Sequence, residues 1–285
     1  MIWAVIVTRD RLALLEQCLE AVRAQARRPD RVLVVDNASS DGTAAWLAEQ
    51  DDVEVLRLEE NVGGAGGFHA GLERAHREGA EWMWLMDDDT IPRPDALEAL
   101  LRPGDDDLIL RASVAVWKNG RLHPMNVPGL ERERVEPLVE AAPRRLLPLR
   151  TSTFVSLLVH RTAVDRFGLP EARYFIWSDD IEYTARVTRG GGRMALVTDS
   201  VVEHRTAKPY TAVTSAGDRF YYHARNTLYM VRGRSWSTLE KASLLYLLAL
   251  TSLQYVRGGG SPRVVLRGLR DGVRGTAATR RSTAA

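Results

Sequence analysis

The sequence predicts an α/β protein: a doubly wound, mostly parallel sheet with helices on both faces, followed by helices at the carboxyl end. Apolar runs of strand length alternate with segments of helical spacing over residues 1–204. This alternation is typical of parallel strands joined by right-handed crossover helices. Polar side chains directly follow several of the apolar runs, at the edge of a parallel sheet where ligands usually bind.

The predicted strands are short apolar runs, one of them alternating as at a sheet edge. They cover residues 2–7, 31–36, 53–58, 82–86, 108–117, 152–160 and 193–204. The predicted helices show apolar residues at helical spacing. They cover residues 11–26, a short segment opening at 41–42, and residues 68–77, 96–101, 178–189, 218–232 and 236–256. Residues 61–67, 118–150 and 204–217 are expected to be irregular. We expect one main α/β domain over 1–232 and a helical segment with a basic tail over 233–285.

Composition excludes some classes of function. The net charge of +2 over 285 residues gives no overall field for nucleic acid, so no nucleic-acid partner is expected. The single cysteine, Cys18, can form no internal disulfide, which fits a reducing cytoplasm. No secretory signal is visible, and the longest apolar stretch, residues 242–256, is too short to span a bilayer.

Three aspartates follow the apolar run WMWLM of residues 82–86. In an extended segment Asp87 and Asp89 point the same way, and two carboxylates on one side suit a divalent cation. The alternative is a polar turn before a proline. His204 ends another predicted strand, and an imidazole beside carboxylates favours Mn²⁺ over Mg²⁺, although a single histidine is often structural.

Two further segments carry candidate binding groups. The glycine-rich stretch NVGGAGGFHAG (61–71) would let backbone amides approach a phosphate or a nucleotide, or it is a tight turn against a closely packed helix. The stretch YFIWSDDIEY (174–183) places aromatic rings beside carboxylates, as sugar-binding surfaces do. The alternative is a helix start capped by Ser178 with acids in the first turn and aromatic residues in the core.

In this order, the motifs resemble those of the family 2 glycosyltransferases with the GT-A fold. The resemblance covers roughly residues 1–232 and consists of VIVTRDR, VVDNASSDGT, NVGGAGGFHAG, WMWLMDDDT, FIWSDDIEYTARV and VVEH. The sub-pattern DDD with WSDDIEY and FYYHARNTLYM is most similar to bacterial galactofuranosyl- and rhamnosyltransferases that build cell-surface glycans.

The resemblance implies an inverting, metal-dependent transfer of a sugar from a UDP- or dTDP-sugar, such as galactofuranose or rhamnose, to a hydroxyl of a glycan or lipid-linked acceptor. It assigns nucleotide-sugar binding to Thr8, Arg9, Asp36, Asn61, Gly64, Asp87 and Asp88. Asp89 and His204 would ligate Mn²⁺ or Mg²⁺. Asp180 matches the general base, with Trp177 and Asp179 binding acceptor, although Asp179 stands where many relatives have Glu and the choice of base stays open. Arg205, Lys208 and Arg225 are candidate cations for the leaving diphosphate.

The carboxyl end and the function each allow more than one interpretation. Helix 236–256 with the arginines after residue 256 fits a peripheral contact with anionic lipid on the inner face of the plasma membrane, or a core or dimer helix in a homo-oligomer. A sugar-phosphate nucleotidyltransferase would also use carboxylates and a metal, but no basic glycine-rich loop lies near the amino terminus. A metal-independent glycosidase and a non-catalytic nucleotide-sugar-binding module are rival functions as well.

Overall fold

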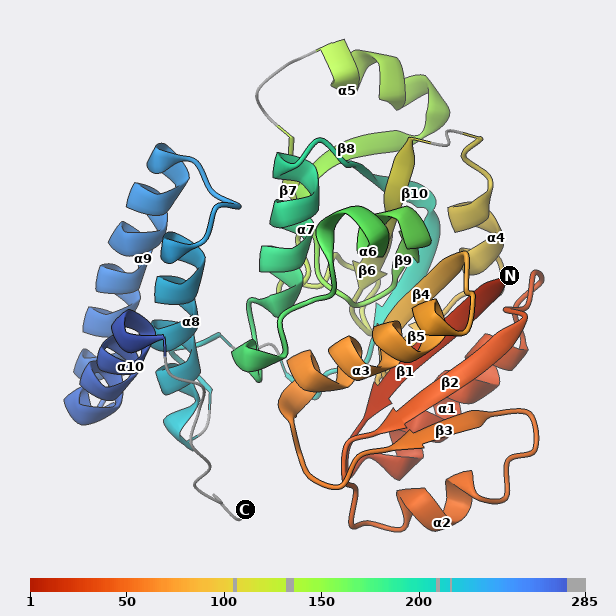
Figure 1. The fold of residues 1–285 in the computed structure, drawn as a ribbon, viewed down its shortest axis with the longest axis horizontal. Coiled ribbons are helices and arrows are strands. Elements are labelled where there is room, and N and C mark those ends of the chain that lie inside the picture. Colours follow the sequence, from red (N-terminus) through yellow and green to blue (C-terminus); the bar gives the residue numbers. More distant parts are fainter. Residues whose placement is uncertain (105–106, 132–135, 209–210, 216, 276–285) are drawn as a thin grey trace.

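A single mixed sheet organises the chain in a computed structural model that describes residues 1–104, 107–131, 136–208, 211–215 and 217–275. The strand order is β3-β2-β1-β4-β9-β6-β10-β8-β7, and β5 pairs with β10 outside this path (Figure 1). The strands are β1 (Ile2–Thr8), β2 (Arg31–Asp36), β3 (Glu54–Arg57), β4 (Trp82–Asp87), β5 (Thr90–Pro92), β6 (Leu108–Val116), β7 (Gly129–Leu130), β8 (Leu146–Thr151), β9 (Leu157–His160) and β10 (Arg193–His204).

The predicted fold class is confirmed. β1 pairs in parallel with β2 and β4, β2 with β3, and β6 with β10. β9 lies antiparallel between β4 and β6, so all the strands named in these parallel pairs point the same way. Their carboxyl ends therefore meet at one edge of the sheet.

Helices cover both faces of this sheet (Figure 1). They are α1 (Leu12–Arg23), α2 (Thr43–Leu47), α3 (Gly63–Arg77), α4 (Ala96–Leu101), α5 (Glu136–Ala141), α6 (Arg161–Phe167), α7 (Asp179–Arg189), α8 (Phe220–Arg232), α9 (Thr238–Arg257) and α10 (Pro262–Arg274), with short 3-10 turns at Ala142–Arg144, Ala172–Tyr174 and Gly217–Arg219.

The alternation of side chains along β1 shows how the two cores form. Trp3 and Val5 lie in one core with Phe68 of α3 and Tyr183 of α7. Ala4 and Ile6, which point to the other face, lie in a second core that α1 and α4 help to build. Because a continuous apolar run fills both cores at once, β1 must be an interior strand, as its sequence predicts.

Several predicted boundaries were wrong. The glycine-rich stretch was expected to be a loop up to residue 68, but α3 begins at Gly63. Only Leu157–His160 of the predicted strand 152–160 is extended in the sheet. The insertion 118–150 was expected to be irregular, yet its described part supplies β8, which pairs with β10, and α5. The short strand β5 was not predicted.

The last three helices form a separate layer at one end of the molecule (Figure 1). α10 approaches α8 so closely that a methyl group on Gly268 would lie 2.7 Å from the carbonyl oxygen of Tyr221. Phe220 of α8 stacks on Tyr255 of α9, with ring centroids 4.3 Å apart. α10 corrects the prediction of a simple basic tail, whose residues 276–285 lie outside the described part. None of the described helices is both long and apolar enough to cross a membrane.

Candidate functional site

The predicted donor and metal residues gather at the carboxyl edge of the sheet. Thr8 at the end of β1 is in register with Asp36 at the end of β2, and Val7 is in register with Asp87 of β4. His204 ends β10, beyond the interposed strands β9 and β6. The chain nevertheless brings the aspartates to it, because β5 folds back and pairs Thr90 with His204.

Asp87, Asp89 and His204 form a cluster with the chemistry of a divalent-cation site. One ligand atom from each lies within 4.8 Å of the others. His204 Nε2 is 3.1 Å from Asp89 Oδ1, close to the roughly 3 Å that separates neighbouring ligands around a small octahedral cation. Asp89 Oδ1 is buried, and no described residue donates a well-aligned hydrogen bond to it. This donor set and the unsatisfied oxygen fit Mn²⁺ or Mg²⁺.

Asn126 orients the imidazole for this role. Its amide nitrogen donates to Thr153 Oγ1 at 3.0 Å, and its Oδ1 lies 2.7 Å from His204 Nδ1. An oxygen facing Nδ1 favours the proton on that atom, so that Nε2, which faces Asp89, can serve as the ligand of a bound cation. Sequence reasoning missed Asn126 because it lies in the insertion that was expected to be irregular.

His123, also missed, packs against His204 with ring centroids 4.5 Å apart. Burial, followed by the charge of His204, lowers the pKa of His123 to about 4, so this ring is neutral at physiological pH. Its Nε2 lies 2.9 Å from Thr206 Oγ1. His123 thus supports the chain just after His204 without adding a charge to the cluster.

Asp88 points away from the cluster, toward the start of the chain. Thr8 Oγ1 donates to Asp88 Oδ2 at 2.9 Å, and the backbone amide of Arg9 donates to the same oxygen at 3.3 Å. Arg11, which sequence reasoning missed, contacts Asp88 Oδ1 at 3.2 Å and Asp89 Oδ2 at 2.8 Å. Thr8, Arg9 and Asp88 therefore lie together, and the contacts of Thr8 and Arg9 in this group are with Asp88.

Burial and mutual repulsion shift the titration of the three aspartates. Burial, followed by the charge of Asp89, raises the pKa of Asp87 to about 7. Burial also raises the pKa of Asp88 to about 6 against the charge of Arg11. Burial also raises the pKa of Asp89, but this effect is outweighed by the contact with His204 and by the charges of His204 and Arg11. The pKa of Asp89 is therefore lowered. Ionising the whole group is unfavourable without a cation.

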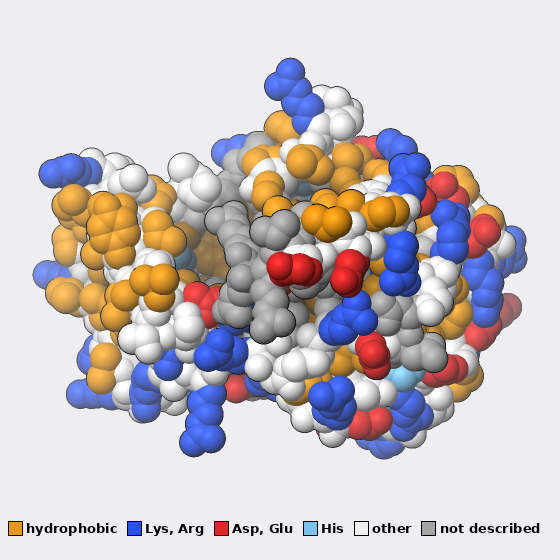
Figure 2. Space-filling model, turned by 90° about the horizontal axis from the view of Figure 1, so that it is seen from above, with side chains coloured by type: hydrophobic (Ala, Val, Ile, Leu, Met, Phe, Trp, Pro, Cys, Tyr) orange, Lys and Arg blue, Asp and Glu red, His pale blue; other side chains and the backbone are white. Residues whose placement is uncertain are grey.

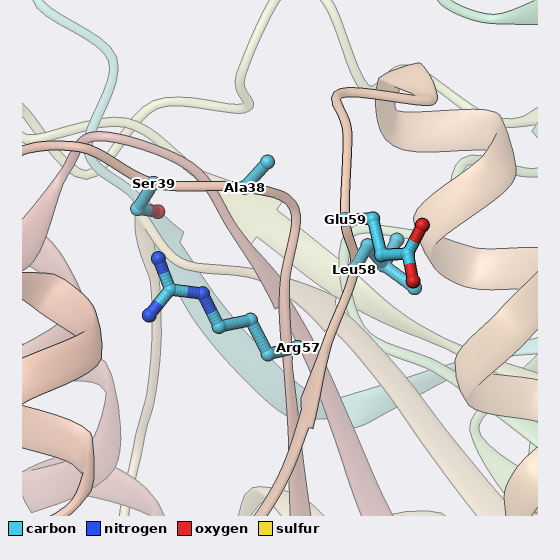
Figure 3. A pocket seen from close by; sticks show the side chains of 5 residues that line it. All are labelled: Ala38, Ser39, Arg57, Leu58 and Glu59. Carbon is cyan, nitrogen blue, oxygen red and sulfur yellow. The ribbon is translucent and has the colours of Figure 1, made fainter.

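A pocket opens beside Asp36 at the ends of β2 and β3. Its volume is about 440 Å³, and Figure 3 shows the side chains that line it, Ala38, Ser39, Arg57, Leu58 and Glu59. Asp36 itself is fully buried; its Oδ1 accepts from the amide of Ser39, and Arg57 Nε lies 3.8 Å from its Oδ2. Arg57 was not predicted, yet it is the group that links Asp36 to the pocket.

Asn61 and the glycines fix the start of α3. Asn61 Oδ1 accepts from the side-chain amide of Asn37 at 3.1 Å and from the backbone amide of Gly63 at 2.9 Å. The backbone amide of Ala65 donates to the carbonyl oxygen of Phe175 at 3.1 Å. A methyl group on Gly64 would meet no atom within 4 Å, so the first turn of α3 presents open backbone there.

The predicted acceptor segment ends in two adjacent carboxylates at the start of α7. Burial, followed by the charge of Asp180, raises the pKa of Asp179 well above its ordinary value, and the charge of Asp87 adds to the shift. Burial raises the pKa of Asp180 to about 6 although the amide of Ile181 donates to its Oδ1 at 2.7 Å. Trp177 is half-buried just before them. Ser178 was expected to cap the helix, but its side chain makes no capping hydrogen bond.

The three candidate cations have different surroundings. Arg205 pairs with Glu203 at 3.0 Å, and Lys208 is exposed on the chain that follows β10. Arg225 is fully buried and donates to the backbone carbonyl oxygens of Arg173 and Tyr174. Its geometry is that of a backbone clamp rather than of a free phosphate ligand.

The sheet order and the polar carboxyl edge are those of the GT-A fold. Solved structures share this fold: the chain superposes on S. aureus TarS 1–349 in complex with UDP-GlcNAc with a TM-score of 0.64 at 15% identity, covering 96% of this chain and 80% of that one. A structure of GalNAc-T7 with UDP, GalNAc and Mn²⁺ gives a TM-score of 0.59 at 12% identity, covering 85% and 53%.

The chain belongs to glycosyl transferase family 2, whose family model matches residues 3–123. It is 31% identical over 212 residues to galactofuranosyltransferase GlfT1 of Mycobacterium tuberculosis, covering 71% of this chain and 69% of that protein. It is 32% identical over 200 residues to GlfT1 of Mycolicibacterium smegmatis, covering 67% and 66%. The matched segment thus spans about two thirds of these relatives. The predicted family and the class of enzyme are confirmed.

Proposed function

We propose that the protein transfers a sugar with inversion from a nucleotide-diphosphate donor, in a divalent-cation-dependent reaction, to a hydroxyl of a glycan or lipid-linked acceptor. One observation carries the proposal: Asp87, Asp89 and His204, from distant parts of the chain, place a ligand atom each within 4.8 Å of one another at the carboxyl edge of the sheet. A divalent cation bound there would neutralise the charge of the departing diphosphate.

Asp180 is the better candidate for the general base. A base must be ionised near the working pH, and a carboxyl with a pKa of about 6 meets that condition at neutral pH. The pKa of Asp179 lies well above the ordinary value, because burial and the neighbouring charges of Asp180 and Asp87 disfavour its ionised form. Asp179 would then donate a hydrogen bond to the acceptor while Asp180 removes the proton from the attacking hydroxyl.

The donor side of the proposal uses the pocket next to Asp36. The nucleoside would lie between Arg57 and Ser39, with the diphosphate extending over the first turn of α3 at Gly64 toward Asp89. UDP or a UDP-sugar is present in the TarS and GalNAc-T7 structures, and the two mycobacterial relatives are galactofuranosyltransferases. UDP-galactofuranose is therefore the first donor to test, with a dTDP-rhamnose donor as the second.

The test measures sugar transfer and nucleotide release by the full chain. UDP-galactofuranose, UDP-galactopyranose and dTDP-rhamnose are each incubated with a glycan acceptor and with Mn²⁺, Mg²⁺ or EDTA. Asp89→Asn and Asp180→Asn should each lower the turnover at least ~100-fold. Asp52→Asn, which changes an exposed acid paired with Arg23, is the control and should have no effect. Transfer that persists in EDTA or in Asp89→Asn would refute the metal assignment.

We also propose that residues 233–285 contact a membrane surface beside the catalytic domain of residues 1–232. Figure 2 shows hydrophobic side chains gathered at the end of the molecule that α9 forms, with Lys and Arg around them. Tyr246 is 65% exposed and Leu247 is 53% exposed. Apolar side chains beside cationic ones suit a surface rich in anionic lipid, where a lipid-linked acceptor would be met. A homo-oligomer formed through the same face is the competing arrangement.

A further inference from the structure

The segment that leads into α7 has an unusual backbone. Phe175, Trp177 and Ser178 have φ values of 64°, 67° and 70°. Residues with a side chain rarely adopt this left-handed region, and three such residues within four positions require support from outside the segment. The conformation of Ser178 also sets the direction in which α7 starts, and therefore the positions of Asp179 and Asp180.

Asn226 of α8 supplies that support. Its side-chain amide nitrogen lies within hydrogen-bonding distance of three carbonyl oxygens of the segment, those of Tyr174 at 3.0 Å, Ile176 at 2.9 Å and Trp177 at 2.9 Å. An amide carries two hydrogens, so the three oxygens share them. The side chain is fully buried, so bulk solvent does not compete for these contacts.

Arg225 completes the clamp. Its Nη2 donates to the carbonyl oxygen of Tyr174 at 2.7 Å, and its Nε donates to Asn226 Oδ1 at 3.0 Å. The second contact fixes the amide so that its nitrogen faces the loop. Phe175 makes two further contacts: its carbonyl oxygen accepts from the amide of Ala65 in α3, and its ring stacks on Tyr222 of α8 with ring centroids 5.0 Å apart.

We propose that Asn226 is a positioning residue for the transfer reaction. By holding Phe175, Trp177 and Ser178 in the left-handed conformation, it places the side chain of Trp177 and the carboxylate of Asp180 against the donor. Asn226 is fully buried and therefore out of reach of a substrate, so it acts through the loop. The inference rests on the proposed function, since it assumes that Asp180 receives the proton of the acceptor hydroxyl.

The test compares Asn226→Ala with Thr227→Val. Thr227 is also buried in α8, but its hydroxyl donates to the carbonyl of His223 within the same helix. We expect Asn226→Ala to lower kcat roughly 10- to 100-fold, the effect of a displacement of about 1 Å at a reacting group. KM for the sugar nucleotide should change less than about threefold, because the nucleoside pocket is formed by other elements. Thr227→Val should keep wild-type kcat.

Two further readouts separate positioning from general stability. Amides 175–180 should exchange with deuterium at least ~10-fold faster in Asn226→Ala, whereas those of β1 should keep their protection. Adding Ser178→Gly to Asn226→Ala should restore part of kcat, because glycine takes a positive φ without strain and Ser178 makes no capping bond that would be lost. Asn226→Ser, a smaller change, replaces Asn226→Ala if the latter is insoluble.

Each outcome of these experiments either supports the proposal or overturns it. A local rise in exchange together with a fall in kcat at constant KM supports the proposal, and recovery with Ser178→Gly strengthens it. Unchanged exchange over 175–180, or a loss of kcat no larger than in Thr227→Val, overturns it. If the wild-type protein transfers none of the sugars, the proposed function fails, and exchange over 175–180 alone then decides whether Asn226 holds the loop.

Discussion

Gly63 and Gly64 are adjacent in the first turn of α3 but should respond oppositely to alanine. Gly63 has a φ of 75°, and a Cβ there would lie 1.9 Å from the carbonyl oxygen of Phe175. A left-handed alanine costs about 1–2 kcal/mol, and relieving a backbone clash costs a further ~1–3 kcal/mol. We therefore expect Gly63→Ala to lower the free energy of unfolding by roughly 2–5 kcal/mol.

Gly64→Ala is the matched control for stability. A Cβ there meets no atom within 4 Å, and alanine within a helix is favoured over glycine by about 0.5–1 kcal/mol. The variant should be as stable as the wild type or slightly more so. The substitution should instead weaken the binding of the donor, because the methyl group occupies the open space where the diphosphate is proposed to pass. We expect about tenfold weaker binding of UDP.

Urea unfolding monitored by tryptophan fluorescence measures the first quantity, and calorimetric titration of UDP with Mn²⁺ measures the second. The slope with denaturant should be unchanged, so that a shift in midpoint reports stability. A Gly63→Ala protein within ~0.5 kcal/mol of the wild type would refute the close packing of α3 against the acceptor loop. Wild-type UDP affinity in Gly64→Ala would remove Gly64 from the donor site.

Three further predictions test the remaining parts of the site. First, kcat/KM should rise about tenfold per pH unit up to pH ~6 and then level off, because Asp180 has its pKa raised to about 6 and acts only when ionised; a limb centred near pH 4 in the pH–rate profile would contradict this. Second, Asn126→Ala should weaken Mn²⁺ binding roughly 10- to 100-fold in calorimetry without substrate, because His204 loses the partner that fixes its tautomer; Asn119→Ala, in an exposed turn, should bind normally. Third, Tyr246→Ser with Leu247→Ser should lower binding to anionic vesicles at least ~10-fold in flotation, since two exposed apolar side chains would no longer insert; unchanged flotation would leave this face to another partner.

Sequence patterns predicted the parts of the fold whose environment is uniform. The run of residues 2–7 is apolar on both faces, and only an interior strand between two helical layers satisfies it, as β1 does. The patterns failed where tertiary contacts determine where an element begins or whether it forms. Gly63 adopts a positive φ that allows α3 to begin five residues earlier than its apolar spacing indicates, and β5 is only three residues long, too short for any periodic signal.

The site residues also divide into those that a sequence pattern indicates and those that it does not. Asp87, Asp89 and His204 could be singled out because each lies at or just after the end of a strand, and their order matches a known motif series. Asn126 and Arg11 were not, since an amide in an insertion and an arginine at a helix start have no distinctive pattern. A weak signal existed for Arg11: three consecutive carboxylates need a cation close by, and TRDR places two arginines after the neighbouring strand.

The carboxyl-terminal helices cannot be tested for a membrane role simply by removing them. α10 is packed on α8 at Gly268 and Gly272, where methyl groups would lie within 3 Å of the α8 backbone, and Arg232 of α8 donates to the carbonyl of Gly272. Cutting the chain after residue 257 would expose this face of α8, the helix that carries Asn226. A truncated protein would then lose transfer through the acceptor loop whether or not α10 meets lipid. Substitutions on the exposed face of α9 avoid this ambiguity, because Tyr246 and Leu247 can be changed without disturbing α8.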